Sequence, residues 1–336
     1  MKKSRFGPVV GALAVGLAGT GLAFAPMIER PASALSLFEQ PKYAAFMVDA
    51  GTGEVLYSRQ ADTQRYPASI TKVMTLYMVF ERLAAGSLRL DDRVTMSARA
   101  AAMPPSKLGL RPGETISVAQ AIRALATKSA NDVAMALAER VGGSVENFAR
   151  LMTIRARQLG MRNSYFVNPH GLPDDRQVTT ARDIATLSMA MIHNFPQYYT
   201  YFQQKEFVFG RQVLANHNHL LNTMPGVDGI KTGYTNAAGF TLAASAVRDG
   251  RRLVAVVLGG PSRMARDSNV ESLLDAGFDV LNARRRGQKL QIADVLAEPG
   301  DLNDSVMLSL VEQGSFDSQP VAQPAQRGAA LRSNRR

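Results

Sequence analysis

The chain reads YPASITKVMTLYMVFERLAAG over residues 66–86. Nearly every position after Ser69 is apolar, and Gly86 is a typical helix stop. A helix that is apolar on all its faces is usually buried in the centre of a domain. We therefore expect a central helix that begins at Ser69, with the other elements packed around it.

Strand-like segments lie on both sides of this helix in the sequence. Residues 44–60 read AAFMVDAGTGEVLYSRQ, in which turn residues separate two apolar runs, and this predicts a β-hairpin. Residues 239–247 and 252–258 are also strand-like, and Asp249-Gly250 between them is a strong hairpin signal. We expect the two hairpins to share one antiparallel sheet.

Helical segments fill the sequence between the two hairpins. Residues 117–120 read SVAQ, a capping-box pattern that predicts a helix toward Thr127. Further helices are predicted over residues 131–140, 145–159, 181–195 and 267–281. Strands at both ends with helices between them indicate an α+β fold, with an antiparallel sheet, flanking helices and a mostly helical lobe.

The composition excludes several kinds of protein. Of the 336 residues 46% are hydrophobic, which is enough for a large buried core. The absence of cysteine excludes disulfides, thiolate catalysis and zinc–sulfur sites. The net charge is +11, but no stripe of Lys and Arg interleaved with aromatic residues occurs in the middle of the chain, which argues against nucleic acid as a partner. Peripheral contact with a membrane or with anionic wall polymers is a better use of this charge.

Residues 1–34 have the pattern of a signal peptide. Three basic residues among the first five precede an uncharged run over residues 6–28, and Ala32-Ser33-Ala34 fits a cleavage site. The alternative is an uncleaved membrane anchor, and both interpretations put the rest of the chain in the periplasm or elsewhere outside the cytoplasm. We expect one folded domain over residues 35–286 and a largely flexible extension over residues 287–336, whose end is rich in Gln, Pro, Ala and Arg.

Ser69 and Lys72 have the spacing needed for nucleophilic catalysis. Residues three apart lie on one face of a helix, so Lys72 can reach back toward Ser69. The start of the helix also presents unpaired backbone N–H groups close to Ser69. Apolar neighbours lower the pKa of a lysine, which lets the neutral amine take the serine proton. The alternative for this motif alone is a serine that caps the helix and a solvated lysine.

Two later motifs carry polar groups that would complete such a site. In the predicted inter-helix loop, Ser129 would pass a proton to a leaving amine and Asn131 would hold a substrate carbonyl. In the predicted strand, Lys231 and Thr232 would bind a carboxylate, while Gly233 would let a substrate backbone lie along the strand edge. Taken singly, these motifs also fit a helix cap and a strand-edge turn.

The three motifs occur in one order, at a helix start, in an inter-helix loop and in a strand. S-x-x-K, a Ser-containing triplet and K-T-G together are the signature of penicillin-binding proteins and class A β-lactamases. With the longer strings YPASITKVMT, LRPGETISVAQAIRALATKSAND, NPHGLP and GVDGIKTGYTNAAGF, the region from about residue 42 to residue 281 resembles the serine D-alanyl-D-alanine carboxypeptidases of the low-molecular-mass penicillin-binding protein family. The resemblance implies that residues 35–286 form a serine D,D-peptidase domain with the β-lactamase/penicillin-binding transpeptidase-like fold.

The resemblance also implies a role for each catalytic residue. Ser69 would attack the carbonyl between the two terminal D-alanines of a peptidoglycan stem peptide and form an acyl-enzyme, with Lys72 as general base. Ser129 and Lys231 would help to protonate the leaving D-alanine. The backbone N–H groups of Ser69 and Tyr234 would form the oxyanion hole.

The remaining implied roles concern substrate, inhibitors and cofactors. Thr232 would contact the terminal carboxylate, and Arg266 stands where family members carry an arginine that faces the site, with Arg263 nearby. Residues 216–219, which read NHNH, lie where some relatives have an arginine near the site, so carboxylate recognition would differ in detail. β-Lactam antibiotics would acylate Ser69, and neither a cofactor nor a metal is implied.

Other functions stay open from the sequence. A class A β-lactamase needs a glutamate that activates the deacylating water, and none of the three glutamates between Ser129 and Lys231 has the E-x-x-L-N context. A D,D-endopeptidase that cuts peptidoglycan cross-links shares all the motifs, and a non-catalytic penicillin-binding or wall-binding protein would keep the fold. A metal site would use His217, His219 and Asp228.

Overall fold

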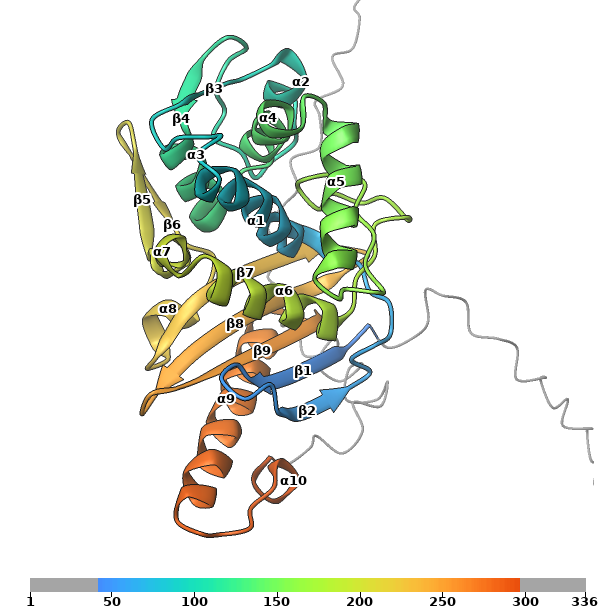
Figure 1. Ribbon diagram of the computed structural model, residues 1–336, viewed down its shortest axis with the longest axis vertical. Coiled ribbons are helices and arrows are strands. Elements are labelled where there is room, and N and C mark those ends of the chain that lie inside the picture. The colour runs from blue at the N-terminus through green and yellow to red at the C-terminus, as the bar shows by residue number, and fades with distance from the viewer. Residues whose placement is uncertain (1–41, 297–336) are drawn as a thin grey trace, which may run out of the picture. The chain divides into compact units, whose positions relative to one another are not determined.

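The main sheet contains both predicted hairpins. The computed structural model describes residues 42–296 (Figure 1), so the predicted signal peptide and residues 297–336 of the predicted extension lie outside the described residues. Five antiparallel strands follow the order β2-β1-β9-β8-β7. The strands of this sheet are β1 (Ala44–Asp49), β2 (Val55–Arg59), β7 (Val227–Thr235), β8 (Gly239–Arg248) and β9 (Arg251–Gly260).

The pairing between β1 and β9 joins the N-terminal hairpin to the late one, and Phe46 lies opposite Val256. The turn between β8 and β9 has positive φ angles of 49° at Asp249 and 74° at Gly250, as the favoured two-residue hairpin turn requires. The sharing of one sheet by the two hairpins is therefore confirmed. Strand β7, which carries the K-T-G triplet, is an edge strand of the sheet.

Most of the helices lie between the two hairpins in the sequence. They are α1 (Thr71–Ala84), α2 (Ala98–Ala101), α3 (Val118–Arg123), α4 (Asn131–Gly142), α5 (Val145–Gln158), α6 (Ala181–Asn194), α7 (Pro196–Tyr199), α8 (Leu220–Thr223), α9 (Arg263–Arg285) and α10 (Ile292–Val295). Between residues 42 and 296 no helix combines the length and the apolar character needed to cross a membrane.

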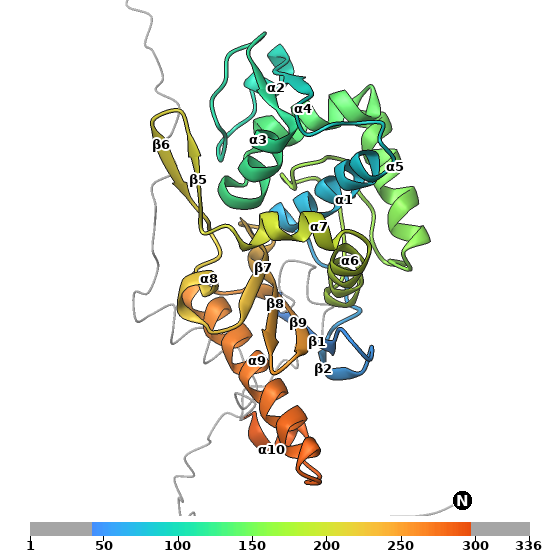
Figure 2. The same ribbon diagram turned by 60° about the vertical axis from the view of Figure 1, so that its left-hand side comes forward.

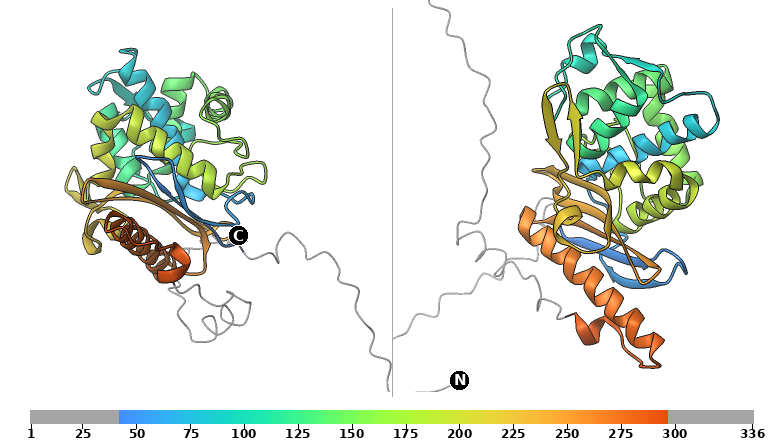
Figure 3. Two further views of the ribbon diagram at one scale, coloured as in Figure 1. Left: turned by 60° about the horizontal axis from the view of Figure 1, so that its bottom comes forward. Right: turned by 90° about the vertical axis from the view of Figure 1, so that its left-hand side faces the viewer.

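Helices cover both faces of the sheet (Figure 2). Helix α9 lies along one face, and α6 with the helical lobe lies on the other (Figure 3). Successive residues of β1 therefore alternate between two cores: Ala44, Phe46 and Val48 pack toward the helical lobe, whereas Ala45 and Met47 pack on the α9 side. Every residue of β1 is buried, as expected for a strand covered on both faces. The predicted α+β fold with a mostly helical lobe is confirmed.

Helix α1 is the predicted central helix, and its residues 71–80 are all buried. The chain enters it through a single 3-10 turn, Ala68–Ile70, so Ser69 lies in this turn and the α-helix begins at Thr71. Ala68 has a φ of +46°, a left-handed conformation that is unusual for a residue with a side chain. The chain thus bends sharply one residue before Ser69.

Several elements differ from the sequence prediction. Helix α9 begins four residues earlier than expected, because the Ser262 hydroxyl caps it by accepting a hydrogen bond from the Ala265 N–H. The capping box at Ser117 is confirmed, but α3 gives way to a π-helical turn over Ala124–Lys128. Two small two-stranded sheets were not predicted, because strands of three or four residues are too short to show a period. They are β3 (Arg93–Thr95) with β4 (Thr115–Ser117), and β5 (Glu206–Phe209) with β6 (Gln212–Ala215).

Candidate active site

The site is centred on Ser69 and Lys72, which the start of α1 brings together. Lys72 Nζ lies 3.0 Å from Ser69 Oγ. Lys72 is fully buried, whereas Ser69 is only half-buried and therefore reachable by a substrate. The alternative of a solvated lysine is therefore wrong. No side-chain cap bond starts α1 either, so Ser69 is not an ordinary helix cap.

Two further acceptors hold the Lys72 amine. Lys72 Nζ donates a hydrogen bond of 2.8 Å to Asn131 Oδ1 and one of 2.6 Å to the backbone carbonyl of His170. Burial, followed by the positive charge of Lys231, lowers the pKa of Lys72 well below its usual value, while the carboxylate of Asp132 opposes this shift. A buried amine with a lowered pKa can act as a general base near neutral pH.

The π-helical turn positions the second motif. Ser129 ends this turn with a left-handed φ of 61°, and Asn131 begins α4. Asn131 Nδ2 donates to the carbonyl of Pro104 at 3.0 Å, which orients its amide oxygen toward Lys72. Ser129 is 5% exposed, and its buried hydroxyl has no hydrogen-bond partner in the described part of the chain. A buried hydroxyl without a partner lowers the stability of the fold, so the Ser129 hydroxyl is available for a hydrogen bond with a bound molecule.

Strand β7 brings the third motif against Ser69. A Cβ added to Gly233 would lie 2.8 Å from the Ser69 backbone nitrogen, so only glycine lets the strand approach this closely. Lys231 and Thr232 are buried, while Tyr234 is 52% exposed and its ring packs in a tilted arrangement against Phe240. Lys231 Nζ donates to the carbonyl of Thr232 at 3.0 Å. Burial and the charge of Arg266 lower the pKa of Lys231 to about 7.

Arg266 is not free to move toward a substrate. Its guanidinium is 3% exposed, pairs with Asp267 at 2.6 Å and donates to the carbonyl of Thr241 at 3.2 Å. Its positive charge acts on the nearby Lys231. Arg263, one helical turn earlier on α9, is exposed. Arg266 therefore lies near Lys231, and its polar contacts are with Asp267 and the Thr241 carbonyl.

Two supporting groups were missed by the sequence analysis. The 168–171 segment supplies the His170 carbonyl that binds Lys72 and the Pro169 carbonyl that accepts from Thr75 Oγ1 at 2.6 Å. Asp132 is fully buried, and its carboxylate accepts hydrogen bonds from the backbone of residues 108, 109 and 133. The string NPHGLP was visible in the sequence, but a backbone carbonyl has no residue-type signature.

The histidine pair does not form a metal site. Among residues 42–296, no three metal-ligating side chains come together. Asp228 instead binds Arg252 in an ion pair of 2.8 Å and accepts a hydrogen bond from Tyr199. His217 is exposed at the surface, and partial loss of hydration with the neighbouring charges of Lys231, Lys128 and Arg263 lowers the pKa of its imidazole.

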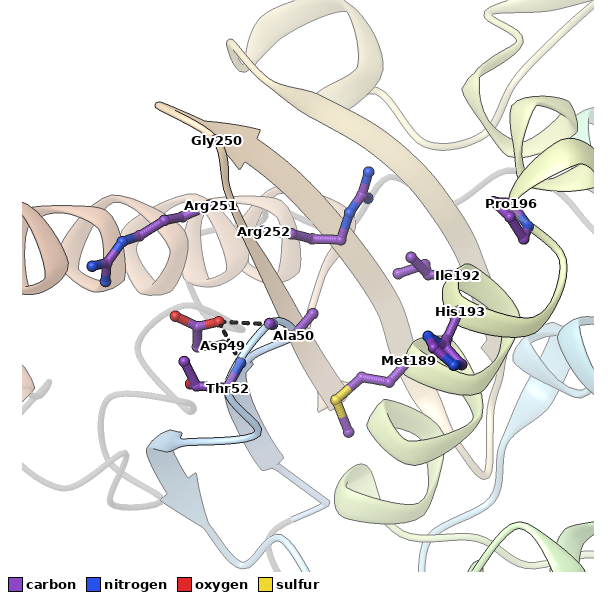
Figure 4. Close-up of a pocket in the computed structure, with 11 residues that line it drawn as sticks. Asp49, Ala50, Thr52, Met189, Ile192, His193, Pro196, Gly250, Arg251 and Arg252 are labelled. Carbon is purple, nitrogen blue, oxygen red and sulfur yellow. Dashed lines mark hydrogen bonds between the residues drawn. The ribbon is translucent and has the colours of Figure 1, made fainter.

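A cavity of about 520 Å³, drawn in Figure 4, is not lined by Ser69. It is walled by the β1–β2 turn, the end of α6 and the β8–β9 turn, with Met189, Ile192 and Pro196 on its apolar side. Its Arg252 is already engaged by Asp228 and Ser245. None of the predicted catalytic residues reaches this cavity, so it gives no alternative site for the motif chemistry.

Comparison with known proteins gives matches of one kind. A family model described as D-alanyl-D-alanine carboxypeptidase matches residues 33–262. D-alanyl-D-alanine carboxypeptidase DacC of Escherichia coli is 40% identical over 242 residues, which are 70% of this chain and 60% of DacC. DacF of Bacillus subtilis is 34% identical over 244 residues, 70% of this chain and 61% of DacF. The chain thus spans about 60% of the length of these curated relatives.

Solved structures agree with the sequence matches. Penicillin binding protein 5 from Haemophilus influenzae superposes with a TM-score of 0.68 and 36% identity, covering 70% of each chain. Penicillin-binding protein D2 from Listeria monocytogenes, in its cefotaxime-bound form, gives a TM-score of 0.64 and 31% identity, covering 70% of this chain and 96% of that one. Identities above 30% together with these TM-scores show that this chain shares both the fold and the family of these proteins.

Proposed function

Because this chain belongs to the D-alanyl-D-alanine carboxypeptidase family of peptidases, we propose that it is a serine D,D-carboxypeptidase that removes the terminal D-alanine from peptidoglycan pentapeptide stems. The observation that carries the proposal is the hydrogen bonding of the Lys72 amine. Asn131 Oδ1 and the His170 carbonyl can only accept hydrogen bonds. A neutral amine has two N–H groups, and these two acceptors occupy both of them. The lone pair then faces Ser69 Oγ at 3.0 Å, where it can take the hydroxyl proton.

The reaction proceeds through an ester on Ser69. Ser69 Oγ attacks the carbonyl carbon of the penultimate D-alanine while its proton passes to Lys72 Nζ. The backbone N–H groups of Ser69 and Tyr234 hold the oxyanion. The C–N bond then breaks, and the leaving nitrogen receives the proton held by Lys72 through the Ser129 hydroxyl, so that D-alanine departs and Lys72 is neutral again. Water gives a proton to Lys72 and attacks the ester, and this proton returns to Ser69 Oγ as the ester breaks and the shortened peptide leaves with a new carboxylate.

The substrate carboxylate is held at the Lys231 end of strand β7. Thr232 offers a hydroxyl there, and Lys231, Asn131 and Gly233 align the substrate backbone and its carbonyl. The charge of Arg266 acts on this end through Lys231, consistent with a supporting rather than a contacting role. β-Lactams carry a strained amide in the same place as the scissile bond, and we expect them to acylate Ser69. A cefotaxime-bound relative supports this expectation.

We further propose an extracytoplasmic location, since peptidoglycan lies outside the cytoplasm and residues 1–34 carry the signal-peptide pattern. Peripheral contact with the membrane or with anionic wall polymers stays a prediction from the net charge of +11.

The test is release of D-alanine. The purified protein is incubated with diacetyl-L-Lys-D-Ala-D-Ala and free D-alanine is measured, with Ser69→Ala and Lys72→Gln run alongside. We expect rapid release by the parent, at least ~1000-fold less by Ser69→Ala and ~100- to 10,000-fold less by Lys72→Gln. Circular dichroism checks that both variants are folded. Release by the parent no faster than by Ser69→Ala would refute the carboxypeptidase proposal, and cross-linked muropeptides would then test the endopeptidase alternative.

A further inference from the structure

Strand β7 carries three landmarks that orient a bound peptide. It is the last strand of the sheet, so its outer edge can receive an added strand. Lys231 and Thr232 lie in its middle, directly before Gly233, which lies against Ser69, and Thr235 ends it. In the proposed function, Lys231 attracts the terminal carboxylate of a substrate, and it lies on the Val227 side of Gly233. The N-terminal part of the same peptide must therefore run past Thr235.

A small pocket lies on that path. Its walls come from the segment before Ser69, the loop after His170 and the end of β7, and include Tyr66, Ala68, Gly171, Asp175, Thr235 and Ala237. A strand advances about 3.3 Å per residue, so the residue preceding the acylated D-alanine lies ~3–7 Å beyond Ser69, next to these walls. The pocket volume is about 20 Å³. This is room for one group of the size of water or ammonium.

The charge of the pocket comes from one carboxylate. Asp174 is held by Arg176, with contacts of 2.9 and 2.7 Å to its two oxygens, so its charge is neutralised locally. Asp175 is exposed, and within residues 42–296 no cation forms an ion pair with it. Its Oδ1 accepts a long hydrogen bond of 3.4 Å from the Tyr66 hydroxyl. Asp175 and Tyr66 thus present an unneutralised carboxylate and a phenol at the pocket mouth.

We propose that this pocket, bounded by Tyr66 and Asp175, receives the side-chain ammonium of the third stem residue, the diamino acid that precedes the two D-alanines. The inference rests on the proposed carboxypeptidase function and names the substrate feature that this site selects. The ammonium donates to the Asp175 carboxylate and to the Tyr66 oxygen, and the small side chain of Ala237 leaves space for it beside the backbone. A peptide whose side-chain amine is acetylated is neutral and too large for this space, so it binds less well.

The experiment compares two substrates that differ by one acetyl group. Initial rates of D-alanine release are measured for Nα-acetyl-L-Lys-D-Ala-D-Ala and for its Nα,Nε-diacetyl counterpart, with the parent, Asp175→Asn, Asp175→Glu and Asp174→Asn. We expect the parent to prefer the free amine by about three- to ten-fold in kcat/KM, mainly through KM. Asp175→Asn should bring this ratio close to one, and Asp175→Glu should retain most of it. Asp174→Asn is the matched control, because its charge is already neutralised, and it should keep the parent ratio.

Failure of this inference is distinct from failure of the proposed function. If the parent releases D-alanine but treats both peptides alike, or if Asp175→Asn slows both equally, the ammonium pocket is refuted while the carboxypeptidase stands. If no peptide is cleaved, both proposals fail. The same pair of peptides is then made with meso-diaminopimelate in place of lysine. The diamino acid whose free-amine peptide loses more kcat/KM on Asp175→Asn is the one that the pocket prefers.

Discussion

At the scale of single residues, the proposed reaction requires opposite protonation states of two buried lysines. In that proposal Lys72 is neutral and takes the proton of Ser69, whereas Lys231 is charged and attracts a carboxylate. Both are lowered in pKa by burial, but Asp132 counteracts the shift only at Lys72, and Arg266 adds to the shift at Lys231. The charge on each lysine also lowers the tendency of the other to be protonated.

A neutral Lys72 together with a charged Lys231 predicts a bell-shaped dependence of kcat/KM on pH. The rate should rise with pH as Lys72 loses its proton, because only the neutral amine is a base. It should fall as pH passes about 7, because Lys231 then loses the charge that attracts the substrate carboxylate. Since kcat/KM reports the free enzyme, the falling limb reflects Lys231 before substrate binds. We expect a loss of about ten-fold over the falling limb, measured by D-alanine release at constant ionic strength.

The control for this profile is a substrate without the carboxylate. A peptide ending in D-alanine amide should lack the falling limb near pH 7, since it offers no anion to Lys231. The rising limb, which belongs to Lys72, should be the same for both peptides. A falling limb of equal size with the amide would assign it to another group and contradict the role given to Lys231.

The residue types of the site could be read from the sequence, but their contacts could not. Helix periodicity was enough to pair Lys72 with Ser69, because both lie within one turn. The second and third groups around Lys72 come from Asn131 and from the His170 carbonyl, and only the folded chain joins these segments. Arg266 shows the same limit, since its position was expected near the site while its pairing with Asp267 depends on the start of α9.

At the scale of elements, the loop over residues 168–171 acts as a support for the 3-10 turn that carries Ser69. Asn168 Oδ1 accepts hydrogen bonds from the Gly171 and His170 N–H groups, which fixes the loop. Gly171 has a φ of +87°, and a Cβ there would collide with the carbonyl of Ala68. The loop can therefore touch the chain directly before Ser69 only because it carries no side chain at this point.

Replacement of Gly171 by alanine should accordingly damage both stability and acylation. We expect a loss of about 2–4 kcal/mol in the free energy of unfolding, from the left-handed backbone and from the displaced Ala68 carbonyl. Acylation of Ser69 should slow by at least ~10-fold, because the turn that holds Ser69 must move. Urea unfolding and the rate of labelling by a fluorescent penicillin measure the two effects.

Gly160→Ala is the matched control. Gly160 has a similar φ of +91°, but nothing lies within 4 Å of an added Cβ. It should lose only the backbone contribution of about 1 kcal/mol and keep the labelling rate of the parent. Equal labelling rates in Gly160→Ala and Gly171→Ala would show that the loop does not position Ser69.

Elements with a strong period were predictable, and short ones were not. The hairpins β1–β2 and β8–β9 combine apolar runs with turn residues, and α5 and α6 carry side-chain caps at Ser144 and Thr180, so their sequences determine them locally. The π-helical turn before Ser129 has no such pattern, because it depends on packing of residues 124–127 in the core. Hairpin β5–β6 is likewise too short for a period to be read.

At the scale of the whole molecule, one sheet separates two hydrophobic cores and belongs to both. The core on the helical side surrounds α1, and the other lies between the sheet and α9. Strands β1, β8 and β9 contribute alternate residues to each core, so neither core can lose its packing without disturbing the strands of the other. Ser69 depends on this arrangement, since α1 fixes it from one core and β7 approaches it from the sheet edge.

We therefore predict that a cavity made under α9 weakens the whole domain in one transition. Leu274 is fully buried in the α9 core. Leu274→Ala should cost about 2–5 kcal/mol and lower Tm by roughly 4–20 °C. Leu90→Ala, at a position that is 38% exposed, is the control and should change Tm little. Because the sheet couples the cores, loss of helical circular dichroism and loss of penicillin labelling at Ser69 should share one midpoint in Leu274→Ala. Labelling that survives above the dichroism midpoint would instead mean that the helical lobe and β7 hold the site independently of α9.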